Sequence, residues 1–131
     1  MDNQYNISIR LSSDDYVFNN IEALEKYKIK IAKKGESIFT NSSFIARSNV
    51  LIVDNIYEKQ ISNINIKDNY KELINIFEIL KNNLNNINYN KEIWLSCSIN
   101  NDQFGFGIDQ EFIDILSKYG YSLSISGIAI L

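Results

Sequence analysis

Residues 102–125, DQFGFGIDQEFIDILSKYGYSLSI, place a Gly-Phe-Gly string directly ahead of a helical pattern. Apolar side chains alternate there with Gly105 and Gly107, which is the pattern of a strand and not of a phosphate-binding loop. Asp109 follows in the position of a helix N-cap, and Gly120 in that of a C-cap. A phosphate would compete with the Asp109 carboxylate for the same amide donors. The stretch therefore predicts a strand, a capped helix and a further strand.

Other strands are predicted by the same period-two alternation of apolar and polar side chains. They comprise residues 5–12, 28–31 and 93–99. Residues 50–53 form a short apolar run, which is typical of a strand covered on both faces. Two asparagines at 100 and 101 predict a hairpin turn from residues 93–99 into the Phe-Gly strand. At Gly127 the alternation changes phase, which predicts a β-bulge in the last strand.

Helical spacing occurs in two further segments. Apolar side chains recur at intervals of three and four over residues 73–87, which predicts the longest helix, beginning at Asn69 in a capping-box arrangement. A shorter helix is predicted to begin with Asp14 or Asp15 as its cap and to end near Tyr27.

The size and apolar content of the chain, 131 residues of which 45% are hydrophobic, are those of one domain. A Leu-x-Lys-Tyr string occurs at residues 24–27 and again at residues 116–119, each time closing a strand-helix-strand pattern. We therefore expect a single α+β domain over residues 1–131. Its mainly antiparallel sheet should have about five or six strands with helices packed on one face, and strand-helix-strand units should flank a long central helix.

Composition narrows the possible partners and locations. The acidic net charge of -3 and the scarcity of arginine argue against nucleic acid, because phosphate binding needs concentrated basic side chains. No apolar run is long enough to cross a membrane and residues 1–10 do not resemble a signal peptide, so we expect a cytoplasmic protein with no membrane partner. The single cysteine, Cys97, fits a reducing compartment and is interpreted as a small core hydrophobe.

The complete absence of histidine is the sharpest functional observation. It excludes Ser-His and Cys-His nucleophilic pairs and removes the commonest zinc ligand. We therefore expect a protein that is not an enzyme, with no catalytic residues, no cofactor and no metal.

Acidic side chains gather around the helix that follows the Phe-Gly string, and three hypotheses account for them. The acidic residues are Asp102, Asp109, Glu111 and Asp114. An acid–base pair or a calcium site is the first hypothesis, but the calcium-loop pattern is absent and sequence alone gives no paired geometry. A capped helix with a solvated face is favoured. The third hypothesis is an acidic surface for a basic partner, which makes these four residues candidates for partner binding.

Lysines cluster between residues 26 and 34, where Lys28 and Lys30 alternate with isoleucines. Charges in this pattern are typical of a protected edge strand. An anion-binding or nucleic-acid patch is the less favoured alternative.

Trp94 stands out because its place in the alternation points it away from the core, toward a sheet face of small polar residues that also includes Arg10. Trp and Arg are typical interface anchors, so this face is a candidate docking surface and both residues are candidates for partner binding. An equally favoured alternative is that the loop at residues 36–49, or a second copy of the chain, covers Trp94.

Several segments carry a family resemblance over most of the chain. They are ISIRLSSDD (residues 7–15), KKGE (33–36), S-x-V-L-I-V (48–53), YKELINIFEILKNNL (70–84) and FGIDQEFIDILSKYGYSLSI (106–125). In these segments the chain resembles a family of small bacterial proteins known as domain of unknown function 4279. The resemblance supplies no catalytic residues. It implies an association with bacterial toxin-immunity gene clusters, in which small proteins neutralise a toxin by binding it.

Our leading hypothesis is therefore a bacterial protein-binding module, most concretely an immunity protein that occludes a cognate toxin domain. Two alternatives remain open. One is a small-ligand sensor or an enzyme that uses carboxylates and tyrosines, which a deep acidic pocket would favour. The other is a structural homodimer formed through the serine-rich sheet face.

Overall fold

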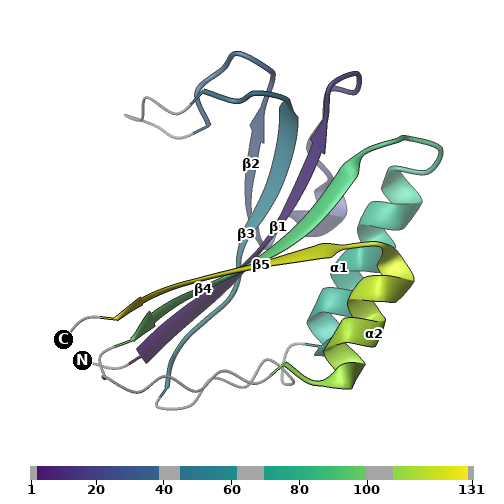
Figure 1. Cartoon of the computed structure of the whole chain (residues 1–131). Helices are drawn as coiled ribbons and strands as arrows, with labels where there is room; N and C mark the ends of the chain where they lie inside the picture. The colour runs from purple at the N-terminus through teal and green to yellow at the C-terminus, as the bar shows by residue number, and fades with distance from the viewer. Residues whose placement is uncertain (1–2, 39–44, 62–69, 100–107, 130–131) are drawn as a thin grey trace.

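The computed structural model of the protein describes residues 3–38, 45–61, 70–99 and 108–129. Five strands form one sheet in the order β2-β3-β1-β4-β5 (Figure 1). They are β1 (Asn3–Ser13), β2 (Lys28–Ala32), β3 (Asn49–Ile61), β4 (Asn90–Ile99) and β5 (Ser122–Ala129). Neighbouring strands are antiparallel except β4 and β5, which are parallel. The expected α+β class and mostly antiparallel sheet are thus confirmed, with one parallel pair that makes the sheet mixed.

Two helices, α1 (Tyr70–Asn83) and α2 (Gln110–Tyr119), lie on the same face of the sheet (Figure 1). They contact each other through aromatic side chains. The ring of Tyr70 stacks on Phe112 with 5.7 Å between centroids, and the ring of Phe77 lies 5.2 Å from that of Tyr119. The opposite face of the sheet carries neither helix.

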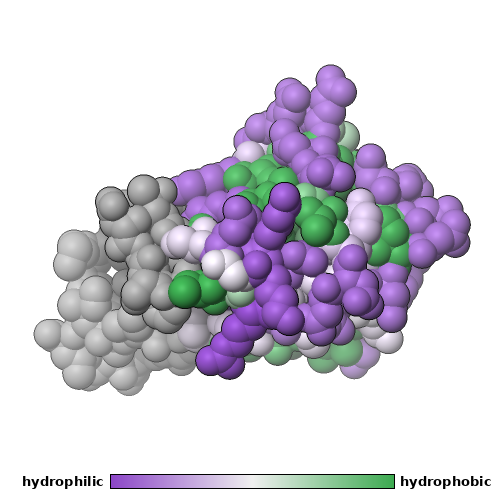
Figure 2. Space-filling model, turned by 90° about the horizontal axis from the view of Figure 1, so that it is seen from above, coloured by the Kyte–Doolittle hydropathy of each residue, from purple (hydrophilic) through white to green (hydrophobic). Residues whose placement is uncertain are grey.

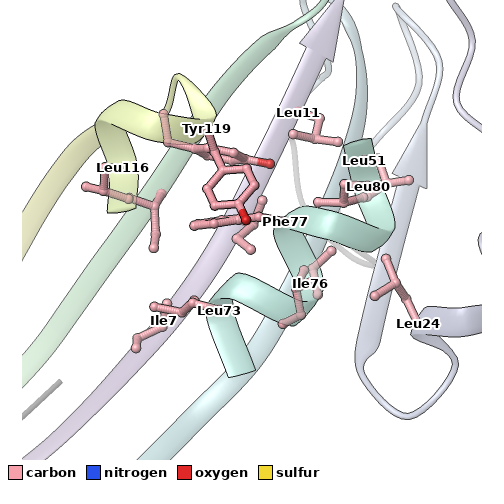
Figure 3. Packing of buried hydrophobic residues seen from close by; sticks show 14 of the residues in the cluster. Ile7, Leu11, Leu24, Leu51, Leu73, Ile76, Phe77, Leu80, Leu116 and Tyr119 are labelled. Carbon is pink, nitrogen blue, oxygen red and sulfur yellow. The ribbon is translucent and has the colours of Figure 1, made fainter. Parts of the chain in front are cut away.

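The core fills the space between the helices and the sheet (Figure 3). Side chains with 0–1% exposure come from both layers: Ile7, Ile9, Leu11, Leu51, Val53, Ile93 and Leu95 from strands, and Leu73, Ile76, Phe77, Leu80 and Phe112 from helices. Burial of each such side chain contributes roughly 1.5–3 kcal/mol relative to exposure. The alternation in β1 and β4 and the stripe on α1 therefore predicted the buried faces correctly. In the edge strands the alternation held less well, since Ile31 of β2 is 38% exposed and Ile125 of β5 is 47% exposed.

Both ends of α2 are capped as the sequence predicts. The Asp109 carboxylate accepts a hydrogen bond of 2.9 Å from the amide of Phe112. At the other end Gly120 adopts a φ of 77°, a left-handed conformation that favours glycine, and the Tyr121 amide donates to the Leu116 carbonyl at 2.9 Å. The chain therefore turns directly from α2 into β5.

The helix predicted between residues 14 and 27 is wrong. Only a single 3₁₀ turn forms there, η1 (Glu22–Leu24), and Ser13 rather than Asp14 or Asp15 accepts hydrogen bonds from the amides that follow β1. The buried side chains of this segment are Phe18, Ile21 and Leu24, of which only Leu24 lies in the 3₁₀ turn. Val17, which fitted the helical pattern, is 40% exposed.

The strand-helix-strand units that were expected to flank a long central helix are not seen. Between β1 and β2 the chain has only η1 in place of a helix. The longest described helix, α1, has 14 residues and lies beside α2 on one face of the sheet instead of between two units (Figure 1). The expected Asn69 cap, the hairpin turn and the Phe-Gly strand with Gly105 and Gly107 lie outside the described residues.

The β-bulge predicted at Gly127 is also wrong. The pairing of β4 with β5 runs without a shift from Glu92 opposite Ser122 to Ile99 opposite Ala129. The irregularity lies instead where β1 pairs with β3, between Ile7 and Ile9. The alternation of apolar and polar residues therefore changes phase at Gly127 without any shift in the pairing of β5 with β4.

Candidate functional site

The face of the sheet opposite the helices, here called the outer face, carries two of the residues predicted to bind a partner. Strand alternation puts the following residues on it: Asn6, Ser8, Arg10 and Ser12 from β1, Ile52 and Asp54 from β3, Lys28 and Lys30 from β2, Glu92, Trp94 and Ser96 from β4, and Ser122, Ser124 and Ser126 from β5. Their neighbours Ile9, Ile93 and Leu95 point into the core. The prediction that Trp94 points away from the core is therefore confirmed.

Trp94 is held in place by two charged neighbours. In the register of β1 and β4, Ser8 is opposite Trp94 and Arg10 is opposite Glu92. The guanidinium carbon of Arg10 lies 4.1 Å from the centroid of the Trp94 ring, and the indole N–H donates a 2.8 Å hydrogen bond to the Glu92 carboxylate. A cation over a tryptophan face contributes about 0.5–2 kcal/mol, depending on how far it is desolvated. The half-buried indole is thus fixed in one orientation before any partner arrives.

A polar network flanks this stack on the β3 side. The Asn6 side-chain amide donates to Asp54 at 3.0 Å, and the ammonium of Lys30 lies 3.7 Å from the same carboxylate. Lys30 lies in β2, at the edge of the described sheet, as the alternating lysines predicted. The Asn6 side-chain oxygen and the Nε of Arg10 are buried without a hydrogen-bond partner within the described residues. Polar groups on this face are thus partly desolvated already.

Serines and a loop border the remainder of the outer face. Ser126 donates a weak 3.5 Å hydrogen bond to Ser96 on the β5 side. On the β2 side, Ile52 is only 5% exposed although it points away from the helices, and Ala46 in the loop before β3 is 3% exposed. On this face Ile52 lies between its register partners, Arg10 of β1 and Lys30 of β2.

Within the described residues, the loop before β3 forms no hydrogen bond or ring contact with Trp94. That part of the loop is residues 33–38 and 45–48, and the indole contacts Arg10 and Glu92 instead. Seen from above, the molecule shows hydrophilic side chains over most of the visible surface, with hydrophobic ones in patches between them (Figure 2). The expectation that residues 36–49 cover Trp94 therefore finds no support in this part of the chain.

The predicted acidic residues divide between a structural role and an exposed surface. Asp109 caps α2 and also accepts a 2.6 Å hydrogen bond from the Tyr70 hydroxyl. Glu111 and Asp114 are exposed on α2, where Asp114 accepts a 2.8 Å bond from Gln110. Asp102 lies outside the described residues. Arg10 and Trp94 therefore do not share a site with Asp109, Glu111 and Asp114, because α2 lies on the opposite side of the sheet.

Three tyrosine–carboxylate hydrogen bonds were not predicted from the sequence. Tyr27 donates to Glu72 at 2.7 Å, Tyr70 to Asp109 at 2.6 Å, and Tyr119 to Glu78 at 2.5 Å. They join α1 to α2 and to the segment before β2. The partners are 39 to 45 residues apart, so no local pattern pairs them.

These contacts change the ionisation of the phenols. Burial and then the hydrogen bond to a carboxylate raise the pKa of Tyr27 and of Tyr70 above its ordinary value. For Tyr119 the hydrogen bond to Glu78 is the larger cause that raises the pKa. The three hydroxyls therefore stay protonated and act as hydrogen-bond donors.

The described residues contain no group of three or more His, Cys, Asp or Glu side chains that could hold a metal ion. In the sheet, Cys97 is opposite Tyr5 of β1 and Gly127 of β5. The structure describes its backbone and not its side chain. In the same part of the chain, neither helix has the length and apolar character needed to cross a membrane.

Comparison with known families gives one result. The chain matches, over residues 3–128, the model of the family described as Domain of unknown function (DUF4279). No curated protein and no solved structure matched the chain.

Proposed function

The chain belongs to the DUF4279 family, and from this premise we propose that it is a protein-binding module, most concretely an immunity protein that neutralises a bacterial toxin domain by occluding it. The link to toxin-immunity gene clusters is what the family resemblance implies. The structural support is the Arg10–Trp94–Glu92 stack on the outer face.

The stack supports binding because it combines the two residue types that most often dominate interface energies. Trp and Arg are enriched among hot spots, and a hot spot gains affinity when its side chains are ordered before association. Here the indole is hydrogen-bonded at its edge by Glu92 and covered by Arg10 on one ring face. Little side-chain entropy remains to be lost when a partner packs against it.

Charge supports a basic or mixed partner surface. The chain has a net charge of -3, so a basic protein is attracted at long range. Next to Trp94 the outer face presents both signs, with Arg10 and Lys30 beside Glu92 and Asp54. Neighbouring charges of opposite sign favour one orientation of a bound partner over others.

Co-purification of the tagged protein with the product of the neighbouring gene tests the proposal. We expect a stable complex, and protection of cells that express that product. Trp94→Ala should weaken the complex by at least about 30-fold, because a hot-spot truncation costs about 2 kcal/mol or more.

Two controls locate the interface. Ser122→Ala changes an exposed outer-face residue with little contact area and should leave affinity within about twofold. The double variant Glu111→Gln/Asp114→Asn tests the acidic surface of α2. Absence of binding and of protection by the wild-type protein would refute the immunity role. A loss in the α2 variant with none in Trp94→Ala would place the interface on the helical side.

A further inference from the structure

A small pocket lies on the helical side, where α1 and α2 end and β4 and β5 begin. Its volume is about 140 Å³, and it is lined by Phe77, Lys81, Tyr89, Lys91, Lys118, Tyr119 and Tyr121. The ring of Phe77 lies against those of Tyr119 and Tyr121. Figure 3 shows the rings of Phe77 and Tyr119 next to each other. Four aromatic rings and three lysines thus form the walls, and none of the lining residues is acidic.

Contacts hold two of the three ammonium groups, those of Lys91 and Lys118, close to these walls. The Lys91 ammonium donates a 3.1 Å hydrogen bond to the Tyr119 carbonyl and lies 5.2 Å from the ring centroid of Tyr89. The Lys118 ammonium lies 5.3 Å from the ring centroid of Tyr119. Lys81 is in the last turn of α1. Across the described residues none of the three lysines forms an ion pair with a carboxylate.

The negative ends of the two helix dipoles offset part of this positive charge. The carboxyl-terminal end of a helix carries about half a negative charge, so the ends of α1 and α2 together supply about one. Lys91 already offsets such an end through the Tyr119 carbonyl. The Glu78 carboxylate, which accepts the hydrogen bond of the Tyr119 hydroxyl, offsets about one more charge. Three ammonium groups against about two negative charges leave a net positive charge of about one around the pocket.

The volume limits what can neutralise that charge. A cavity of about 150 Å³ holds one benzene, whereas pockets for larger ligands measure about 300–1,000 Å³. The space therefore fits a compact group and is too small for a nucleotide. Burial raises the pKa of Tyr89 and of Tyr121, so both phenols stay protonated and can donate hydrogen bonds to an anion.

We propose that this pocket binds a compact dianion, namely phosphate or the phosphate group of a small phosphomonoester. Lysine is a common phosphate ligand that acts as a point charge, and the three lysines that line the pocket leave it with a net positive charge that attracts an anion of this kind. The site is separate from the outer face and does not depend on the immunity role.

Titration calorimetry of the wild-type protein with inorganic phosphate and with phenyl phosphate, at constant ionic strength, tests this site. We expect saturable binding with one site per chain. Tighter binding of phenyl phosphate would identify an aromatic monoester as the ligand, and tighter binding of phosphate would identify the free ion.

Matched variants distinguish the pocket from general charge attraction. Lys81→Gln/Lys118→Gln removes two exposed lysines of the pocket and should weaken phosphate binding at least about tenfold. Lys33→Gln/Lys34→Gln removes the same charge from exposed positions near β2 and should leave binding within about twofold. No saturable binding, or equal weakening in both variants, would overturn the site.

A second measurement covers the case in which the pocket variant fails to fold. Amide chemical shifts of the wild-type protein, recorded during the phosphate titration, should change most at Lys91, Tyr119, Gly120 and Tyr121. Changes spread over all lysines of the chain would contradict the proposal.

Discussion

At the scale of single residues, Trp94 is the most informative position in the chain. Its indole is held by the Arg10 guanidinium at 4.1 Å and by the Glu92 carboxylate at 2.8 Å. The alternation of apolar and polar residues was enough to predict which face of the sheet Trp94 occupies, because successive side chains of a strand point to opposite faces. The two contacts that hold the indole depend on strand register, which alternation alone does not fix.

The stack should contribute measurably to stability. Arg10→Met keeps an apolar stem but removes the cation, so we expect the free energy of unfolding to fall by about 0.5–2 kcal/mol in urea denaturation. Arg47→Met is the matched control, since Arg47 is exposed in the loop before β3, and should change stability by less than about 0.5 kcal/mol. Equal effects of the two substitutions would show that the stack adds nothing.

At the scale of elements, local signals predicted α2 best. Its cap residues, Asp109 and Gly120, adjoin the helix in sequence and act on its own backbone. The parallel pairing of β4 with β5 could not be predicted in this way, since it depends on how α2 packs across the sheet. The helix that was wrongly predicted before β2 also depended on tertiary packing. Ile21 and Leu24 are buried as the helical pattern required, but Phe18 is buried in place of Val17, which pattern alone could not show.

The tyrosine hydroxyls that join α1 to its neighbours predict a dependence of stability on pH. Their pKa values are raised in the folded state, so the folded chain keeps phenolic protons that the unfolded chain releases. This contribution is complete below pH 10.0, the ordinary pKa of tyrosine, and is lost as the pH rises above it. Urea denaturation at increasing pH should therefore show the free energy of unfolding declining above this value.

Tyr27→Phe identifies the origin of that decline. The variant removes one of the raised phenols together with its hydrogen bond to Glu72, so it should be less stable at neutral pH but lose less stability in alkali. Stability that stays constant or rises above pH 10.0 in the wild-type protein would contradict the assigned hydrogen bonds.

At the scale of the whole molecule, the sheet separates two surfaces of different character. The helical side holds the core, the tyrosine contacts and the lysine pocket, while the outer face presents Trp94 and Arg10 among serines and paired charges. The length and apolar content of the chain predicted a single domain. The alternation of apolar and polar residues in the strands predicted a sheet with one buried face and one polar face. The pocket could not be predicted, because its walls come from both helices, from β4 and from the turns that precede β4 and β5.

The central claim is that the outer face binds a partner protein, and the single tryptophan of the chain allows a direct test. Protein labelled with fluorotryptophan should give one fluorine resonance, from Trp94. Addition of the unlabelled product of the neighbouring gene should shift or broaden this resonance until the complex is saturated, and the Glu111→Gln/Asp114→Asn variant should respond in the same way. A complex that forms while the Trp94 resonance stays unchanged would contradict the claim.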